Sequence, residues 1–138
     1  MSDLVRMSIT MDRDLSDQLD TLIGGSPNEN RSEFIRDMIR CRLVEREWER
    51  DEEVLGTITI IYDHHAGDVT QRLTALQHEL HDCILATTHV HLDRHICAEV
   101  IIAKGPAEVI KRFADAVRQQ RGIIHTAFSP STLGHQLV

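Results

Sequence analysis

The apolar and polar positions near the start of the chain follow two different periods. Met7, Ile9 and Met11 alternate with polar neighbours, which predicts a strand over residues 6–11 with one buried face. Asp12 and Asp14 suit the start of a helix. Apolar side chains then recur at helical spacing in two stretches, Leu15, Leu19, Leu22 and Ile23, followed by Phe34, Ile35, Met38, Ile39 and Leu43. The predicted order is strand, helix, helix.

A second set of elements follows a segment dense in charge, residues 45–53. We place a domain boundary there, which gives domains 1–50 and 51–138. The apolar pattern then predicts a strand, a helix, two strands joined by a short turn, a helix and a last strand. This βαββαβ order is the ferredoxin-like arrangement, in which both helices cover one face of a four-stranded sheet. The chain is therefore predicted to be α+β.

Composition narrows the classes of function. The 138 residues carry a net charge of −7 and contain no apolar run long enough to span a bilayer, so we expect no membrane association. Cys41, Cys83 and Cys97 make an odd count without framework spacing, which indicates reduced thiols in a cytoplasmic protein. The negative charge argues against a passive nucleic-acid coat. Any binding to DNA must come from a few well-placed side chains.

The predicted N-terminal strand needs a partner, because an isolated strand does not persist in water. Two copies pairing antiparallel would form a ribbon, with the methionines and Ile9 packed on helices. Arg6, Ser8 and Thr10 would project from the opposite face, and a two-stranded ribbon fits the major groove of DNA. This organisation is a ribbon-helix-helix DNA-binding domain. The alternative is an ordinary half-exposed edge strand.

The start of the second helix is a candidate phosphate contact. Asn30-Arg31-Ser32-Glu33 has the form of a capping box, a polar cap with Glu three residues on. A helix N-terminus presents free backbone N–H groups that bind anions. We therefore expect Arg31 and Ser32 to contact the DNA backbone.

A candidate metal site lies in the second domain. In His89-Val90-His91 the two imidazoles share one face of a strand, and Cys97 lies on the next strand across the turn. If His91 lies opposite Cys97, the connecting loop has an odd number of residues, which we expect to be three. A thiolate with two imidazoles suits a soft to borderline late transition metal.

The same alternation predicts which sheet face carries this site. Ile96, Ala98, Val100 and Ile102 form a wholly apolar set, so we expect them to pack on the helices. Cys97 and Glu99 then point to the helix-free face, where a second subunit would bind. His78, on a helix, would be poorly placed for its own chain's site and would complete a neighbour's. Glu99, His81 and His64 are candidates for second-shell or alternative positions.

These residues resemble those of the nickel-responsive regulator family NikR over about residues 5–128. The most specific stretch contains Gln77-His78, His81-Asp82, His89-Val90-His91 and Cys97-Ala98-Glu99. The resemblance implies an N-terminal ribbon-helix-helix followed by an ACT-type regulatory domain. It also implies a homotetramer, a dimer of dimers, in which Ni²⁺ is held in square-planar geometry by His89, His91 and Cys97 of one chain and His78 of another.

The resemblance further implies a repressor of nickel-uptake genes whose affinity for a double-stranded DNA operator rises when Ni²⁺ binds. Glu33 and Asp37 match family positions that can hold a weaker cation. Ser8 replaces a common Thr, and Ala66-Gly67 stands where some relatives carry basic residues, so base preference and DNA affinity are open.

Other functions remain as alternatives. One is a metal storage or trafficking protein without operator binding, and another is a sensor of a different late transition metal, since Cu²⁺ binds more tightly than Ni²⁺ to most donor sets. An antitoxin is disfavoured by the large second domain. Catalytic zinc sites keep an open position and a general base. A hydrolytic metalloenzyme is therefore disfavoured, because this chain offers four protein ligands and only Glu99 nearby. We therefore expect no enzymatic activity.

Overall fold

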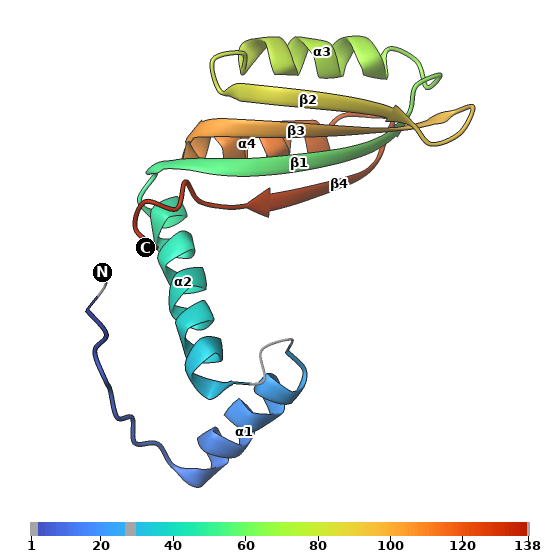
Figure 1. The fold of residues 1–138 in the computed structure, drawn as a ribbon. Helices are drawn as coiled ribbons and strands as arrows, with labels where there is room; N and C mark the ends of the chain where they lie inside the picture. Colours follow the sequence, from blue (N-terminus) through green and yellow to red (C-terminus); the bar gives the residue numbers. More distant parts are fainter. Residues whose placement is uncertain (1–2, 27–29, 138) are drawn as a thin grey trace. The chain divides into compact units, whose positions relative to one another are not determined.

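The computed structural model describes residues 3–26 and 30–137, and it divides the chain into two compact units (Figure 1). The first ends at Cys41 and the second begins at Arg42. Helix α2, Arg31–Glu49, runs through this division and ends within the charged segment at residues 45–53. The functional boundary after residue 50 stays a prediction. No helix within the described residues is both long and apolar enough to cross a membrane.

The first unit contains α1, Arg13–Gly24, and the first part of α2. Asp12 caps α1 by accepting a hydrogen bond from the Leu15 N–H. At α2, Asn30 Oδ1 accepts from the Ser32 N–H at 2.8 Å, which supports the predicted helix start. The reciprocal half of the predicted capping box is not formed, because Glu33 bonds to arginines one and two turns further along α2.

Residues 3–12 carry no assigned helix or strand in the single chain. Met7 is 77% exposed and Ile9 57% exposed, so the apolar side of the predicted strand lies uncovered. A lone strand cannot satisfy its backbone groups or bury its apolar side chains, which accounts for this state. Pairing with a second copy of the chain stays a prediction.

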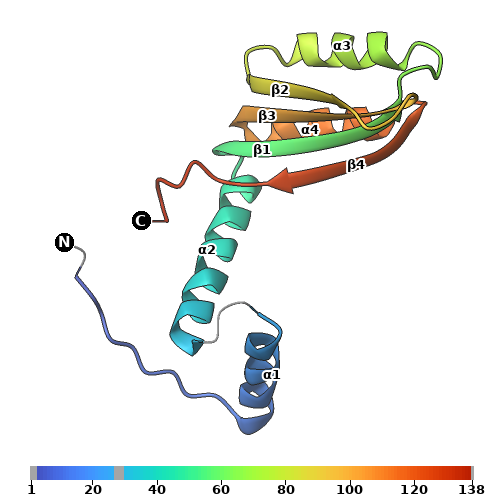
Figure 2. The same cartoon turned by 45° about the vertical axis from the view of Figure 1, so that its right-hand side comes forward.

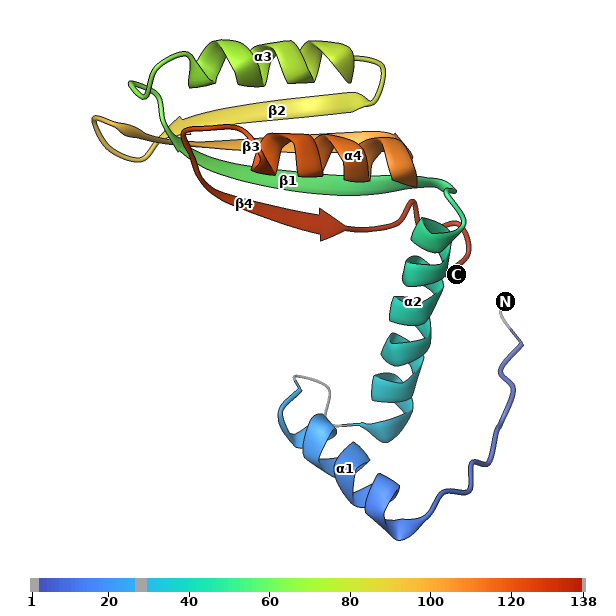
Figure 3. The ribbon, with the colours of Figure 1, turned by 180° about the vertical axis from the view of Figure 1, so that it is seen from behind.

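The second unit is a four-stranded antiparallel sheet with two helices on one face (Figures 1 and 3). Its elements are β1 Glu53–Asp63, α3 Val69–Glu79, β2 Ile84–His91, β3 Ile96–Pro106, α4 Ala107–Arg118 and β4 Ile123–Pro130. The strand order is β2-β3-β1-β4, so β2 and β4 are the edges. The predicted α+β class and βαββαβ order are confirmed.

The core lies between the sheet and the helices. On β1, every second residue from Val54 to Tyr62 is buried, whereas Leu55, Thr57, Thr59 and Ile61 are only half-buried. The buried set packs with Val69 and Leu73 of α3 and with the inner face of α4, lined by Ile110, Phe113, Ala114 and Val117. One continuous apolar layer therefore fixes the sheet against both helices.

The end of α2 joins this second unit. The Trp48 ring meets Phe128 edge-on at 5.4 Å, and its Nε1–H donates to the Ser131 carbonyl at 2.8 Å. Gly56 makes room for them, since a Cβ there would stand 3.0 Å from Ile110 and 3.3 Å from Trp48. Figure 2 shows the chain passing from α2 directly into β1.

Candidate metal centre

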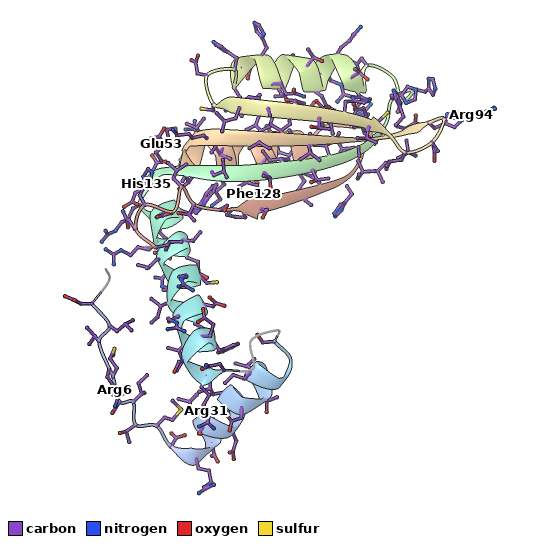
Figure 4. The ribbon with its side chains drawn as sticks, in the orientation of Figure 1. Arg6, Arg31, Glu53, Arg94, Phe128 and His135 are labelled. Atoms are coloured by element: carbon purple, nitrogen blue, oxygen red, sulfur yellow. The ribbon has the colours of Figure 1, made fainter. Side chains whose placement is uncertain are left out.

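The hairpin of β2 and β3 places the candidate ligands opposite one another. His91 pairs with Cys97 and His89 with Glu99 across the antiparallel ladder. The Leu92 N–H still bonds to the Ile96 carbonyl, so the loop proper is Asp93-Arg94-His95. The predicted three-residue loop and the predicted register are therefore confirmed. Figure 4 labels Arg94 at the tip of this hairpin.

The predicted sheet face was wrong. Cys97 is fully buried and Glu99 is 8% exposed, and both lie with Ile101 and Ala103 on the side of β3 that faces the helices. The set we expected there, Ile96, Ala98, Val100 and Ile102, is half-buried on the other face. Glu99 can be buried because Gln77 of α3 donates to Oε1 at 2.7 Å and Tyr62 donates to Oε2 at 3.3 Å.

The position of Cys97 on the helix side also removes one argument for a metal site shared between two chains. Because the cluster is on the helix side, His78 on α3 is not separated from it by the sheet. The sequence signal for the buried face was in β1, where Ile58 and Ile60 alternate with threonines and Tyr62 follows on the isoleucine face. Tyr62 pairs with Cys97 in the sheet, so the buried face of β1 fixes the face of Cys97.

Three side chains converge at the end of the sheet. Cys97 Sγ lies 3.2 Å from His64 Nδ1 and 3.3 Å from His91 Nδ1. The potential ligand atoms of these three residues all lie within 4.8 Å of one another, so a single metal ion could bind to all three. His64 follows β1, and its backbone N–H bonds to the His95 carbonyl at 3.0 Å. The structure thus gives His64, predicted as a second-shell or alternative residue, a place beside two predicted ligands.

His89 lies next to this cluster. Its ring centroid is 5.1 Å from that of His91, and its Nδ1 is 3.4 Å from the Tyr62 hydroxyl. Tyr62 in turn bonds to Glu99, which Gln77 also contacts. Glu99, predicted as a second-shell residue, therefore connects α3 with the strand that bears His89. Sequence reasoning missed Tyr62 and Gln77 as members of this network.

His78 does not join the other predicted ligands within the chain. It is exposed on α3, and its ring stacks on His81 with centroids 5.9 Å apart. His81 Nδ1 lies 3.0 Å from the His78 carbonyl oxygen and its Nε2 3.0 Å from Asp82. Both histidines are thus outside the cluster of His64, His91 and Cys97.

The electrostatics of the cluster favour a protonated thiol in the metal-free chain. Burial raises the pKa of the Cys97 thiol, and the nearby Asp63, Asp93 and Glu99 carboxylates raise it further. Burial and Glu99 raise the pKa of Tyr62 to about 12, so the phenol stays a hydrogen-bond donor. A bound cation would reverse this balance by stabilising the thiolate.

The predicted DNA contacts all belong to the first unit. Arg6, Ser8 and Thr10 are exposed in the N-terminal segment, and Figure 4 labels Arg6 and Arg31. Arg31 forms a bidentate pair with Asp20, with contacts of 2.6 to 2.9 Å. Ser32 is exposed at the N-terminus of α2. A phosphate at this helix end would have to compete with Asp20 for the guanidinium.

The predicted weak cation site is occupied by arginines. Glu33 bonds to Arg36 and Arg40, and Arg40 also bonds to Asp37 at 2.9 Å. The Glu33 and Asp37 carboxylates therefore both bond to the Arg40 guanidinium and do not line an open cavity. A cation could bind between them only after Arg40 moved away.

The fold and the cluster together define a two-unit protein with a cysteine–histidine candidate metal centre on a ferredoxin-like domain. Residues 55–130 match the family model described as "NikR C terminal nickel binding domain". The chain belongs to the NikR family.

Relatives match along the whole chain. One from Nitratidesulfovibrio vulgaris is 41% identical over 138 residues, and one from Pyrococcus abyssi is 46% identical over 137 residues. Each match covers 99% of both chains, and each relative bears the name "Putative nickel-responsive regulator". Among solved structures, an uncharacterized protein from Thermotoga maritima aligns with a TM-score of 0.53 at 15% identity. That match covers 57% of this chain and 98% of the other, and it concerns the fold alone.

Proposed function

We propose that this protein is a cytoplasmic transcription regulator, without enzymatic activity, that represses nickel-uptake genes when it binds Ni²⁺. The main support is the register that sets His91 across from Cys97, with His89 two residues away on the same face. Two imidazoles and a thiolate form a donor set that late transition metals prefer over Mg²⁺ or Ca²⁺. Membership of the NikR family supports nickel as the metal.

In this proposal one chain supplies His89, His91 and Cys97, and a neighbour supplies His78. The exposure of His78 supports this, since no contact within the described residues draws its ring toward the cluster. The position of β2 supports it as well, because an edge strand leaves His89 and His91 open to a second subunit. Bound Ni²⁺ would supply a cross-link between the two chains.

The DNA-binding part of the proposal rests on the first unit. Among the described residues, eight of the twelve exposed large hydrophobic side chains fall there, although this unit holds fewer than a third of the chain. A unit of this size does not bury a sufficient core alone, so a second copy is the natural partner. Pairing of the N-terminal segments would direct Arg6, Ser8 and Thr10 into a major groove, with Arg31 and Ser32 at the phosphates.

The assembly in this proposal is a dimer of dimers. The sheet face away from the helices carries half-buried apolar residues, among them Leu55, Ile61, Val100 and Ile102. A second copy would bury them and bring four regulatory domains together between two pairs of DNA-binding units. Nickel can act at a distance only through its preference for one such arrangement, and that preference sets the upper limit of the coupling.

The deciding experiment measures operator binding with and without Ni²⁺. Fragments from the regions upstream of nickel-transport genes are titrated with the full chain by fluorescence anisotropy, with a shuffled fragment as control. We expect saturating Ni²⁺ to tighten specific binding at least tenfold and to leave binding of the shuffled fragment nearly unchanged. Tight nickel binding without any sequence-specific DNA binding would instead identify a storage or trafficking protein.

A further inference from the structure

We propose that Asp51 is a positioning residue that fixes the end of α2 to the second unit, and that the effect of nickel on DNA binding depends on it. Asp51 lies in the turn between α2 and β1, and its side chain bonds to the start of α4. The turn and α4 both belong to the second unit. The inference rests on the proposed function, because it concerns how a change in the second unit reaches the DNA-binding part of the chain.

The last turn of α2 closes in a pattern that usually contains glycine. The Asp51 N–H donates to the Trp48 carbonyl at 3.3 Å, and the Glu52 N–H donates to the Glu47 carbonyl at 3.0 Å. These two bonds form a Schellman motif, in which the residue just after the helix takes a left-handed conformation. Asp51 has a φ of 53° and is the one non-glycine residue with a positive φ among those the structure describes. The chain therefore keeps a side chain where glycine would be less strained.

The Asp51 side chain explains why glycine is not used there. Its Oδ1 accepts a hydrogen bond from the Glu108 N–H at 2.8 Å, and the Glu52 carbonyl accepts one from the Ala107 N–H at 3.0 Å. The N-cap residue of α4, Pro106, makes no side-chain cap hydrogen bond of its own. The turn after α2 therefore caps the first turn of α4, and a carboxylate suits the positive end of the helix dipole.

Trp48 fastens the last turn of α2 at a second point. Its Nε1–H donates to the Ser131 carbonyl at 2.8 Å, and its ring packs edge-on against Phe128, which Figure 4 labels at this end of the sheet. The Ser131 N–H donates in turn to the Leu55 carbonyl at 2.8 Å, which holds the C-terminal segment on β1. We call these contacts, together with those of Asp51, the α2 anchor.

Glu47 opposes the closed state of the α2 anchor. It is only 6% exposed, and its Oε2 has no hydrogen-bond partner within the described residues. A buried carboxylate oxygen without a donor is unfavourable, because water would solvate it once the end of α2 moved away from the sheet. The α2 anchor is thus a balance of opposing contributions. Loss of the bond between Asp51 and Glu108 should therefore be enough to loosen it.

Two strands connect the α2 anchor with the candidate metal centre. β1 begins at Glu53, directly after the turn, and ends at Asp63, beside that centre. β3 runs back from Ile96 to Pro106, directly before α4. The two strands pair in one unbroken register over this whole length. Coupling between two sites requires an element with two states that both sites bias, and in this proposal the closed and loosened α2 anchor is that element.

The first test uses Trp48, the single tryptophan of the chain, as a probe of the α2 anchor. Acrylamide quenching of its fluorescence is measured in the full chain. Asp51→Ala should raise the quenching constant about twofold, because the indole becomes open to solvent. Asp51→Asn keeps an acceptor oxygen and tolerates a positive φ, so it should behave as the parent does. Asp115→Ala, which removes an exposed acid of α4, is the control.

The second test measures DNA binding of the same variants with and without Ni²⁺, on the fragments described above. Asp51→Ala should reduce the tightening caused by nickel from about tenfold to less than about threefold. Its affinity for Ni²⁺ in the absence of DNA should stay within about twofold of the parent's, since Asp51 is not a proposed ligand. Asp51→Asn and Asp115→Ala should keep the full nickel effect.

Two results would overturn the proposal. One is a folded Asp51→Ala chain, checked by circular dichroism, in which Trp48 is quenched as in the parent. The other is an Asp51→Ala chain with a more strongly quenched Trp48 that still shows the parent's full nickel effect. Should Asp51→Ala fail to fold, Asp51→Gly decides the question, because it removes the same bond and relieves the positive φ. A parent chain without any nickel effect on DNA binding would instead contradict the regulatory function, a failure that the quenching comparison does not share.

Discussion

His91 Nδ1 lies 3.3 Å from Cys97 Sγ, and the two residues are direct partners across the β2–β3 ladder. The distance is short because both side chains leave the same face of adjacent strands. The three-residue loop that follows His91 maintains this register, since a slip of one residue would turn His91 to the other face. The candidate metal centre therefore depends on the hairpin as a whole, and not only on the side chains of His91 and Cys97.

The raised pKa of Cys97 predicts that metal binding depends on pH. The thiol must lose its proton before it can bind, and burial raises its pKa, so near neutral pH each metal ion displaces one proton. Apparent Ni²⁺ affinity should therefore rise about tenfold per pH unit above neutrality, until the thiol's raised pKa is reached. Titrations across pH in two buffers measure this slope.

The matched variant is Cys97→Ser, which keeps the size of the side chain and removes the thiolate. We expect it to lose the thiolate-to-metal absorption and most of the proton release. A Cys97→Ser chain with the parent's spectrum and pH dependence would exclude Cys97 as a ligand.

A mixed oligomer tests whether His78 comes from a neighbouring chain. His78→Ala and Cys97→Ala chains should each lose tight Ni²⁺ binding. When they are unfolded and refolded together, one of the two sites in each mixed pair carries both lesions and the other is intact, as twofold symmetry requires. Tight binding should then return at about half of the mixed-pair sites, as measured by equilibrium dialysis. If binding stays absent in the mixture, all four ligands belong to one chain.

Replacement of Arg6 tests the proposed ribbon. If Arg6 makes one bidentate base contact, Arg6→Ala should weaken specific DNA binding by about 1–3 kcal/mol and leave nickel affinity intact. Arg118→Ala is the control, because it removes an equal charge from the exposed end of α4. The ribbon hypothesis fails if Arg6→Ala and Arg118→Ala bind specific DNA equally well.

Removal of one hydroxyl tests the network behind His89. Tyr62 donates to the buried Glu99, and its hydroxyl lies 3.4 Å from His89 Nδ1. Tyr62→Phe should reduce the free energy of unfolding by about 1 kcal/mol, since Glu99 keeps only its bond from Gln77. Nickel affinity should fall about tenfold as His89 loses an orienting partner. Unchanged nickel affinity in a destabilised Tyr62→Phe chain would limit the network to a structural role.

We expect Arg72 to stabilise the second unit through three hydrogen bonds. Its guanidinium contacts Asp68 at 2.9 Å, the Gln120 side-chain oxygen at 3.1 Å and the Arg121 carbonyl at 2.6 Å. Arg72→Ala should lower the free energy of unfolding by about 1–2 kcal/mol in urea denaturation. Arg112→Ala, which removes an exposed pair with Glu108 at 4.0 Å, should cost less than about 0.5 kcal/mol. Equal losses of unfolding free energy in the two variants would contradict a stabilising role for the hydrogen bonds of Arg72.

The sequence alone was enough to predict the elements of the second domain and the register of its central hairpin. Apolar periodicity separates helices from strands, and the His-x-His spacing with Cys97 six residues after His91 requires an odd loop for a shared face. The strand at residues 6–11 has a clear pattern too. A single chain cannot form it, however, because its partner would be another copy.

The tertiary structure alone decided which face of the sheet carries Cys97 and which histidine lies beside it. Alternation shows that two residues share a face, but it does not say which face is covered, and both faces of β3 are mostly apolar. The pairing of Cys97 with the buried Tyr62 sets the face, and Glu99 can be buried on it because Gln77 and Tyr62, far away in the sequence, donate to its carboxylate. His64 reaches Cys97 because β1 pairs with β3, and such long-range pairing leaves no local trace in the sequence.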